Sequence, residues 1–264
     1  MTYIFYQVDA FSDKLFEGNP AGVMFVDTFF STKMMQKIAE ENNLSETAFV
    51  VRRGNTFDLR WFTPKVEIDF CGHATIATAH VLHKEYGLDP PFIFNSKIGE
   101  LRVTIRKGLY VLSAPIPKIK PLVKPENLEG VFKSLPIDSF KAGKDIYFVF
   151  DTFKEIINYK LDITKISNLS KNGVGITARY SDEFDIISRF FVPNEGIAED
   201  PVTGSAHAAL GVYWSRAIGK NKLKAYQASE RGGVIWLEVT DNRINIIGNA
   251  ITYMKAEIRI THVD

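Results

Sequence analysis

Glu199-Asp200-Pro201-Val202-Thr203-Gly204-Ser205-Ala206-His207 decides the fold of this chain, because a shorter stretch of the same kind occurs at Cys71-Gly72-His73-Ala74-Thr75. In each stretch a glycine opens a segment with the composition of a helix. The first turn of a helix leaves backbone N–H groups without intrahelical partners, and such groups bind small anions. Two helix starts of this kind predict one shared pocket for a small anionic ligand.

The similarity extends upstream of both glycines. Arg60-Trp61-Phe62-Thr63-Pro64 precedes Gly72, and Arg189-Phe190-Phe191-Val192-Pro193 precedes Gly204. Chance is the alternative explanation for such short motifs, but in both halves a strand-like segment comes before the glycine and a helix-like one after it. We therefore interpret the chain as two related halves. Alignment of the two glycines pairs Cys71 with Thr203, His73 with Ser205, and Thr75 with His207.

Composition limits the classes of protein to which this chain can belong. The chain has 264 residues, 45% of them hydrophobic and 24% charged, which is enough for two domains with separate cores. A formal net charge of +1, with basic residues scattered among acidic ones, does not favour a nucleic-acid partner. The first residues lack the pattern of a signal peptide, and no apolar run is long enough to cross a bilayer. With Cys71 as the single cysteine, we expect a cytoplasmic protein without an internal disulfide or a membrane partner.

The first half is predicted to be strands around one apolar helix. The segment between Gly72 and Tyr86 is apolar on nearly all sides, which predicts a buried helix that ends at Gly87. A shorter amphipathic helix begins at Ser31 or Thr32 and ends near Asn43. The strands that alternation and turn signals predict are residues 3–10, 23–26, 47–51, 57–62, 101–106 and 109–114.

The second half repeats this arrangement after a proline-rich connector. Pro115, Pro117, Pro121 and Pro125 place the domain boundary, so that the N-terminal lobe is 1–115 and the C-terminal lobe 116–264. The last strand could pack back on the first lobe. The predicted elements are a helical region at 153–169, a helix at 205–218 that stops at Gly219, and strands at 146–150, 175–179, 184–192, 234–240, 243–247 and 251–260.

These elements predict an α+β fold of two similar lobes. Each lobe is expected to be a mostly antiparallel strand barrel around a central helix, with a ligand cleft between the lobes where the two helix starts face one ligand. A small anionic ligand is the expected occupant of the cleft.

Three acidic residues could move a proton in such a cleft. Glu46 stands where a strand begins, and Glu199 and Asp200 stand just before the second helix. A carboxylate becomes a useful proton carrier when it is desolvated and within hydrogen-bond reach of its target. Taken from their local sequence alone, Glu46 could equally be a solvated strand-edge residue and Asp200 a turn or capping residue.

The remaining polar candidates have structural alternatives. His73 and His207 could pack or cap, and Cys71 could be a small buried hydrophobe. His80 and His83 are three residues apart without an acid at a metalloprotease spacing, so the sequence predicts no metal site.

Five motifs follow one another across nearly the whole chain. They are Phe16-Glu17-Gly18-Asn19-Pro20-Ala21-Gly22-Val23, Asn43-Leu44-Ser45-Glu46-Thr47-Ala48-Phe49, Cys71-Gly72-His73-Ala74-Thr75, Arg189-Phe190-Phe191-Val192-Pro193 and the stretch from Glu199 to His207. In this order they resemble the phenazine biosynthesis PhzF-like family. The resemblance implies a diaminopimelate epimerase-like fold, a small carboxylated metabolite as the ligand and, usually, a homodimer.

The resemblance also implies an activity and a set of site residues. In the family's isomerase, which acts on a dihydro-hydroxyanthranilate, a glutamate moves a proton between carbons without a metal or an organic cofactor. The matching residue here is Glu46. Matches to the other catalytic positions are His73, Asp200 and Ser205, and the expected substrate-binding positions are Gly72, Gly204, Asn19, Ala74 and Ala206.

Two alternatives to this isomerase stay open. Related epimerases and proline racemases place a thiol before each helix-start glycine, whereas this chain has Cys71 and Thr203 there. A threonine hydroxyl is too weak an acid to replace a thiol near neutral pH, which excludes two-thiol racemisation. A one-base or Cys71-assisted epimerase of an amino or imino acid is the first alternative. The second is a catalytically silent carboxylate-binding or scaffold protein.

Overall fold

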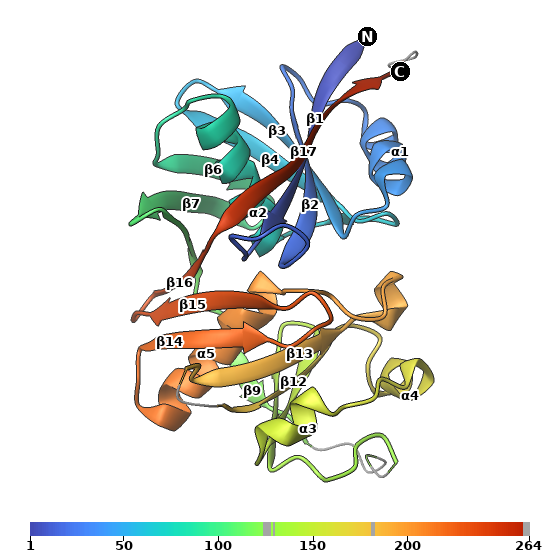
Figure 1. Cartoon of the computed structure of the whole chain (residues 1–264), viewed down its shortest axis with the longest axis vertical. Helices are drawn as coiled ribbons and strands as arrows, with labels where there is room; N and C mark the ends of the chain where they lie inside the picture. Colours follow the sequence, from blue (N-terminus) through green and yellow to red (C-terminus); the bar gives the residue numbers. More distant parts are fainter. Residues whose placement is uncertain (124–127, 129, 181–182, 261–264) are drawn as a thin grey trace. The chain divides into compact units, whose positions relative to one another are not determined.

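Two units make up the chain, and the computed structural model describes residues 1–123, 128, 130–180 and 183–260 of it (Figure 1). The first unit is Met1–Ala114 together with Asn245–Asp264, and the second is Pro115–Ile244. Of the four connector prolines, Pro125 lies outside the described residues.

The first unit is a sheet in which antiparallel and parallel pairs alternate. β1 pairs antiparallel with β2, β2 parallel with β3, β3 antiparallel with β4, β4 parallel with β6, and β6 antiparallel with β7. The C-terminal strand β17 returns to pair with β1. The strands are β1 (Thr2–Ala10), β2 (Asn19–Phe25), β3 (Glu46–Arg53), β4 (Thr56–Phe62), β5 (Glu67–Ile68), β6 (Phe92–Ser96), β7 (Gly99–Arg106), β8 (Leu109–Pro115) and β17 (Ala250–Arg259).

The second unit repeats this order of pairings. β10 pairs antiparallel with β11, β11 parallel with β12, β12 antiparallel with β13, β13 parallel with β14, and β14 antiparallel with β15. This topology is what an internal repeat requires. The strands are β9 (Ile119–Pro121), β10 (Asp138–Ala142), β11 (Asp145–Phe150), β12 (Val174–Arg179), β13 (Ile186–Phe191), β14 (Lys222–Gln227) and β15 (Gly233–Val239), while β16 (Arg243–Gly248) begins in this unit and continues into the first.

A long apolar helix occupies the same place in the strand order of each unit. α2 (Gly72–His80) lies between β4 and β6, and α5 (Gly204–Ile218) lies between β13 and β14. Every residue of α2 is buried, and the helix contacts β1, β2, β3 and β17 of its unit (Figure 1). Gly219 ends α5 at φ 72°, a conformation that favours glycine.

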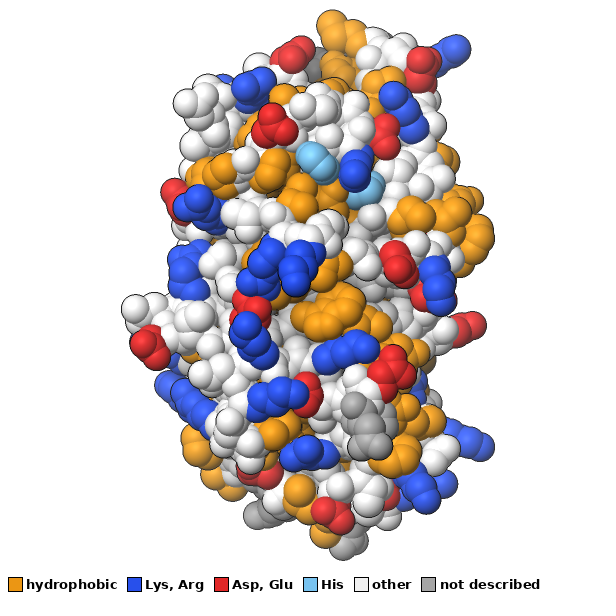
Figure 2. Space-filling model, turned by 60° about the vertical axis from the view of Figure 1, so that its left-hand side comes forward, with side chains coloured by type: hydrophobic (Ala, Val, Ile, Leu, Met, Phe, Trp, Pro, Cys, Tyr) orange, Lys and Arg blue, Asp and Glu red, His pale blue; other side chains and the backbone are white. Residues whose placement is uncertain are grey.

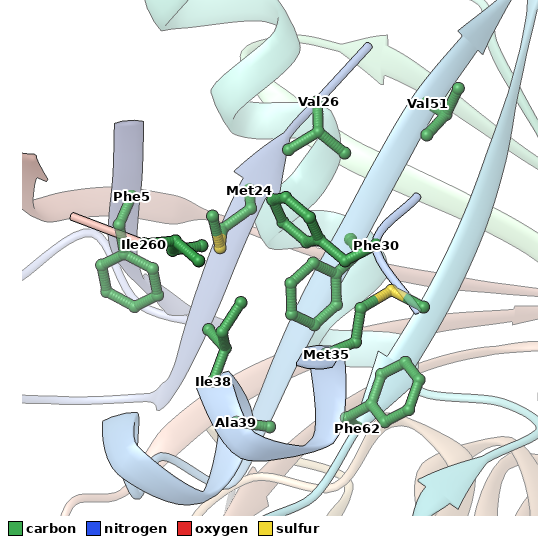
Figure 3. Packing of buried hydrophobic residues seen from close by; sticks show 11 residues of the cluster. Phe5, Met24, Val26, Phe30, Met35, Ile38, Ala39, Val51, Phe62 and Ile260 are labelled. Carbon is green, nitrogen blue, oxygen red and sulfur yellow. The ribbon is translucent and has the colours of Figure 1, made fainter. Parts of the chain in front are cut away.

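The α1 helix (Thr32–Asn42) covers the other side of the first unit's sheet. The Ser31 hydroxyl accepts a hydrogen bond from the N–H of Met34 at 3.2 Å, which caps the helix start. Met35 and Ile38 then pack against apolar side chains of the strands (Figure 3). The buried cluster consists of Phe5, Met24, Val26, Phe30, Met35, Ile38, Ala39, Phe49, Val51, Phe62 and Ile260.

Several predicted elements differ from the observed ones. The helix predicted for 72–86 is α-helical to His80 and continues as a π-helix, η1 (Val81–Glu85), a distinction that apolar patterning cannot make. The single helical region predicted for 153–169 is two short helices, α3 (Phe153–Ile157) and α4 (Ile163–Leu169), because Asp162 caps a new helix start.

Five strands were not predicted, and the longest of them is β14, which lies between the second long helix and β15. β9 lies in the proline-rich stretch, where it still pairs because Pro121 stands at its end, and β10 follows shortly after Pro136. β5 has only two residues, and β6 directly follows Pro90 and Pro91. A short 3₁₀ turn, η2 (Pro193–Glu195), completes the described elements.

The surface carries both signs of charge. On the face that Figure 2 shows, Lys and Arg side chains are interspersed with acidic and apolar ones, in keeping with the formal net charge of +1. None of the helices in the described ranges combines the length and the apolar character that crossing a lipid bilayer requires.

Candidate active site

The edge of the first unit where β2 and β3 begin brings two predicted site residues into contact. Glu46 is the first residue of β3 and His73 the second residue of α2, and Nε2 of His73 lies 2.9 Å from Oε2 of Glu46. The His73 side chain is 4% exposed and that of Glu46 15%. A carboxylate and an imidazole are therefore held together in a largely water-excluded place that solvent reaches mainly from the Glu46 side.

The other ring nitrogen of His73 has two neighbours. Nδ1 lies 3.2 Å from Nδ2 of Asn19 and 3.5 Å from Sγ of Cys71, and both of these residues are buried. Asn19 begins β2, the strand parallel to β3, so it arrives at the same sheet edge as Glu46. The imidazole is thus fixed between a carboxylate on one side and an amide and a thiol on the other.

A glycine makes the approach of Asn19 possible. Gly18 has φ +70°, and a Cβ at this position would lie 2.2 Å from the backbone oxygen of Ala10. The Gly18-Asn19 pair in the first motif is therefore explained by a tight turn that leads directly into the site.

Electrostatics sets the protonation of the thiol and the imidazole. Burial, reinforced by the nearby charge of Glu46, raises the pKa of Cys71 to about 11, so the thiol is neutral at physiological pH. Burial alone disfavours the charged form of His73, but its acidic neighbours Cys71 and Glu46 outweigh this effect and raise the pKa of His73 well above 6.5.

In the second unit, the candidate residues before α5 form a hydrogen-bonded loop. The Thr203 hydroxyl donates to Oδ2 of Asp200 at 2.5 Å, and both residues are buried. Gln227, fully buried at the end of β14, accepts from the N–H of Thr203 at 2.8 Å and donates to the backbone oxygen of Asp200 at 2.6 Å. One amide side chain therefore fixes both ends of the loop that carries Asp200.

The predicted pairing of positions has a structural counterpart at the two helix starts. The Thr75 hydroxyl donates to the backbone oxygen of Cys71 at 2.5 Å. The His207 ring donates from Nδ1 to the backbone oxygen of Thr203 at 2.8 Å. Thr75 and His207 are the residues that alignment of the two glycines paired, and each binds the residue before its own helix.

The repeated Arg-aromatic-Phe-x-Pro motif has the same role in both units. Arg60 makes two hydrogen bonds to the carboxylate of Glu67, at 2.8 and 2.9 Å. Arg189 makes two to Glu199, each at 2.7 Å. Glu67 and Glu199 each stand five residues before the helix-start glycine, so each arginine anchors the loop that leads into the buried helix.

The other predicted site residues occupy the helix starts. Gly72 and Ala74 are buried in the first turn of α2, and Gly204 and Ala206 are buried in that of α5, where Ser205 is half-buried. Among the residues that the structure describes, the residue before each helix places no side-chain hydrogen bond on the first turn. The backbone N–H groups of each first turn are thus not used by a side-chain cap. α2 belongs to the first unit and α5 to the second, so each start is described within its own unit.

Sequence reasoning missed two features of these sites. Gln227 is a single polar residue at a strand end, and no local motif marks it. The second feature is a group of three possible metal ligands, Glu46, Cys71 and His73, whose ligand atoms all lie within 4.8 Å of one another. It was missed because Glu46 is distant in sequence from the other two.

Comparison with known proteins places the chain among close relatives. A family model described as phenazine biosynthesis-like protein matches residues 8–256. An uncharacterized isomerase of Pseudomonas aeruginosa is 42% identical over 263 residues, covering 98% of this chain and 100% of the relative. A crystal structure of a PhzF family protein from Enterococcus faecalis has a TM-score of 0.92 and 40% identity, covering 98% of this chain and 100% of that one.

A more distant likeness concerns the fold alone. A hydroxyproline epimerase of Agrobacterium vitis is 10% identical with a TM-score of 0.62, and the match covers 97% of this chain and 92% of that one. The α+β, diaminopimelate epimerase-like architecture predicted from the sequence is therefore confirmed. The names of the close relatives support an isomerase of the PhzF type.

Proposed function

The chain belongs to the phenazine biosynthesis-like family, and we propose that it is a cofactor-independent isomerase that moves a proton on a small carboxylate-bearing metabolite. The observation that carries the proposal is the contact between Glu46 and His73, 2.9 Å long and largely shielded from water. General acid–base catalysis needs such a carboxylate within reach of the reacting carbon.

Glu46 is the proposed base. Its side chain is the more exposed member of the pair, at 15% against 4% for His73, so it is the one that a bound metabolite can reach. It removes a proton from one carbon and returns it to another. The imidazole of His73 holds the carboxylate in place.

The helix starts are proposed to bind the substrate. Removal of a carbon-bound proton leaves negative charge on the substrate, and the N-terminal end of a helix stabilises negative charge through its backbone N–H groups and its dipole. For α2 these groups belong to Gly72 and the residues after it. The expected ligand group at such a start is a carboxylate.

Cys71 is proposed to be structural rather than catalytic. A thiol with a pKa of about 11 holds little thiolate at neutral pH and is a poor base. This argues against the Cys71-assisted epimerase. Roles for Asp200 and Ser205 in the same reaction are part of the proposal, and Asp200→Asn and Ser205→Ala test them separately.

A screen in deuterated water tests the reaction class. The purified protein is incubated with a panel of amino, imino and cyclic hydroxy or amino carboxylic acids, and nuclear magnetic resonance records deuterium uptake and new isomers. We expect at least one compound to gain deuterium at carbon and to yield a product of unchanged formula. Tight binding of a carboxylate without exchange or conversion would instead identify a catalytically silent binding protein.

A further inference from the structure

We propose that the second unit contains a separate binding site, a cavity for a small amphipathic acid, meaning a molecule with an apolar body and one carboxylate. The cavity has a volume of about 490 Å³, within the range of about 300 to 1,000 Å³ that small-molecule sites occupy. Among the residues that the structure describes, none of those proposed for the isomerase reaction lines it.

The cavity lies where the second unit departs from the internal repeat. In the first unit, the connection between parallel β2 and β3 contains the eleven-residue helix α1, which packs its apolar face on the sheet. The corresponding connection between parallel β11 and β12 contains two helices, α3 and α4, of five and seven residues (Figure 1). The residues between these two helices, 158–162, all line the cavity. The divided helix therefore leaves a hollow where the first unit has packed core.

Aromatic and aliphatic side chains form the apolar part of the lining. Phe132, Phe150 and Ile176 line the cavity and belong to a buried cluster of the second unit. The ring centroid of Phe132 lies 5.1 Å from that of Phe150 and 5.5 Å from that of Tyr159. The apolar body of a ligand would be removed from water against these side chains.

Tyr159 adds a hydroxyl that lacks a partner. The oxygen is buried, and the described residues offer it no hydrogen-bond partner. Burial raises the pKa of Tyr159 to about 12, so the hydroxyl keeps its proton and can donate it to a ligand oxygen. A buried polar group without a partner is unfavourable, and an acceptor atom on a ligand would remove that penalty.

The charges of the lining favour an acid over a neutral or basic ligand. Three lysines line the cavity, and one of them, Lys165, is paired with Asp162 at 3.5 Å. Within the described ranges, Lys133 and Lys160 have no ion pair or hydrogen bond, and Glu155 is the acid of the lining that has none. Two unpaired lysines against one unpaired acid leave a surplus of one positive charge, which suits a single carboxylate.

Isothermal titration calorimetry on the full-length protein tests this site without any isomerase substrate. The probes are octanoate and 4-phenylbutyrate, which share the carboxylate but differ in having an aliphatic or an aromatic body. We expect saturable binding of at least one acid, at least about tenfold tighter than that of its uncharged amide, octanamide or 4-phenylbutyramide. Whichever acid binds more tightly shows which kind of body the cavity prefers, and either preference supports the proposal.

Two variants connect the binding to the cavity. Tyr159→Phe should weaken binding of the acid about tenfold without lowering the melting temperature, because the described residues give that hydroxyl no partner to lose. Lys160→Gln should weaken binding and reduce its dependence on salt. The matched controls, Tyr180→Phe and Lys154→Gln, make the same changes in the second unit outside the cavity lining and should bind as the unmodified protein does.

Failure of both acids to bind at concentrations up to about 1 mM would overturn the proposal. So would an affinity that is the same in Tyr159→Phe, Lys160→Gln and the unmodified protein, because the acid would then bind elsewhere. No turnover is measured in either case. Such a result therefore leaves the isomerase proposal standing, and a failed exchange screen leaves the cavity proposal standing.

Discussion

Oε2 of Glu46 lies 2.9 Å from Nε2 of His73, and this contact joins the first residue of β3 to the second residue of α2. Two segments far apart in sequence meet there because parallel β2 and β3 begin at one sheet edge, beside the start of the buried helix. The pair gives the first unit a carboxylate held beside an imidazole in a place that is largely shielded from water.

Replacement of His73 is predicted to impair exchange without unfolding the protein. His73→Gln keeps a polar side chain but removes the imidazole that contacts the Glu46 carboxylate. We expect solvent exchange into a responsive substrate to fall by about 10²-fold or more. Circular dichroism and thermal unfolding check that the fold is kept, and unaltered exchange in a folded variant contradicts the assigned role.

Loss of the Cys71 thiol is predicted to leave the exchange of solvent deuterium into the substrate nearly intact. The pKa of about 11 keeps this group protonated at neutral pH, so it contributes no base. Cys71→Ala is expected to lower the exchange rate less than about threefold, while cavity formation costs on the order of 1 kcal/mol of unfolding free energy. Inactivation of Cys71→Ala with Glu46→Gln still active would establish the cysteine-assisted epimerase instead.

Gln227 is predicted to stabilise the loop that carries Asp200. Gln227→Met keeps the volume but leaves the N–H of Thr203 and the backbone oxygen of Asp200 without their partner. Each buried unsatisfied group costs about 1 to 3 kcal/mol, so the free energy of unfolding should fall by about 3 kcal/mol. Urea unfolding measures this change, and a loss below about 0.5 kcal/mol would show that the hydrogen bonds of Gln227 are dispensable for stability.

The Arg189–Glu199 pair is predicted to contribute more to the free energy of unfolding than an exposed ion pair does. Both side chains are largely buried, at 13% and 16% exposed, and they share two hydrogen bonds of 2.7 Å. Arg189→Met should cost about 2 to 3 kcal/mol because Glu199 loses charged hydrogen bonds. The matched control is Arg53→Met, which breaks the more exposed pair with Asp58, at 54% and 32% exposed, and should cost at most about 1 kcal/mol. Equal losses in the two variants would contradict this account.

Acid is predicted to destabilise the protein through two buried histidines. Burial lowers the pKa of both His207 and His80 to about 4, against 6.5 for an ordinary histidine. The unfolded chain therefore binds protons first as the pH falls from about 6.5 to about 4, and the free energy of unfolding declines through that window by on the order of 3 kcal/mol for each residue. Above pH 6.5 neither residue contributes a pH dependence.

His207→Gln isolates one of these contributions. Denaturant unfolding at pH 7.5 and at pH values down to about 4 should give a shallower pH dependence in the variant than in the unmodified protein. An identical slope in the two proteins would show that His207 takes up a proton in the folded state.

The fold and part of the site could be predicted from the sequence because the motifs that mark them are local. Glycine before an apolar helix marked α2 and α5, and alternating residues marked most long strands. Gln227 could not be found in this way, because its partners are backbone atoms that only the folded loop brings to it. The arginines of the repeated motif were visible, but their glutamate partners are contacts across a loop. β9 was missed because prolines in its stretch indicated a connector.

The most direct test of the account is the rate of deuterium uptake in Glu46→Gln, measured with a substrate that the unmodified protein labels. Glu41→Gln, the same change at an exposed residue of α1, is the control and should label at the normal rate. We predict that Glu46→Gln, although folded, labels at least about 10²-fold more slowly. Full labelling by folded Glu46→Gln would contradict the claim that this carboxylate carries the proton.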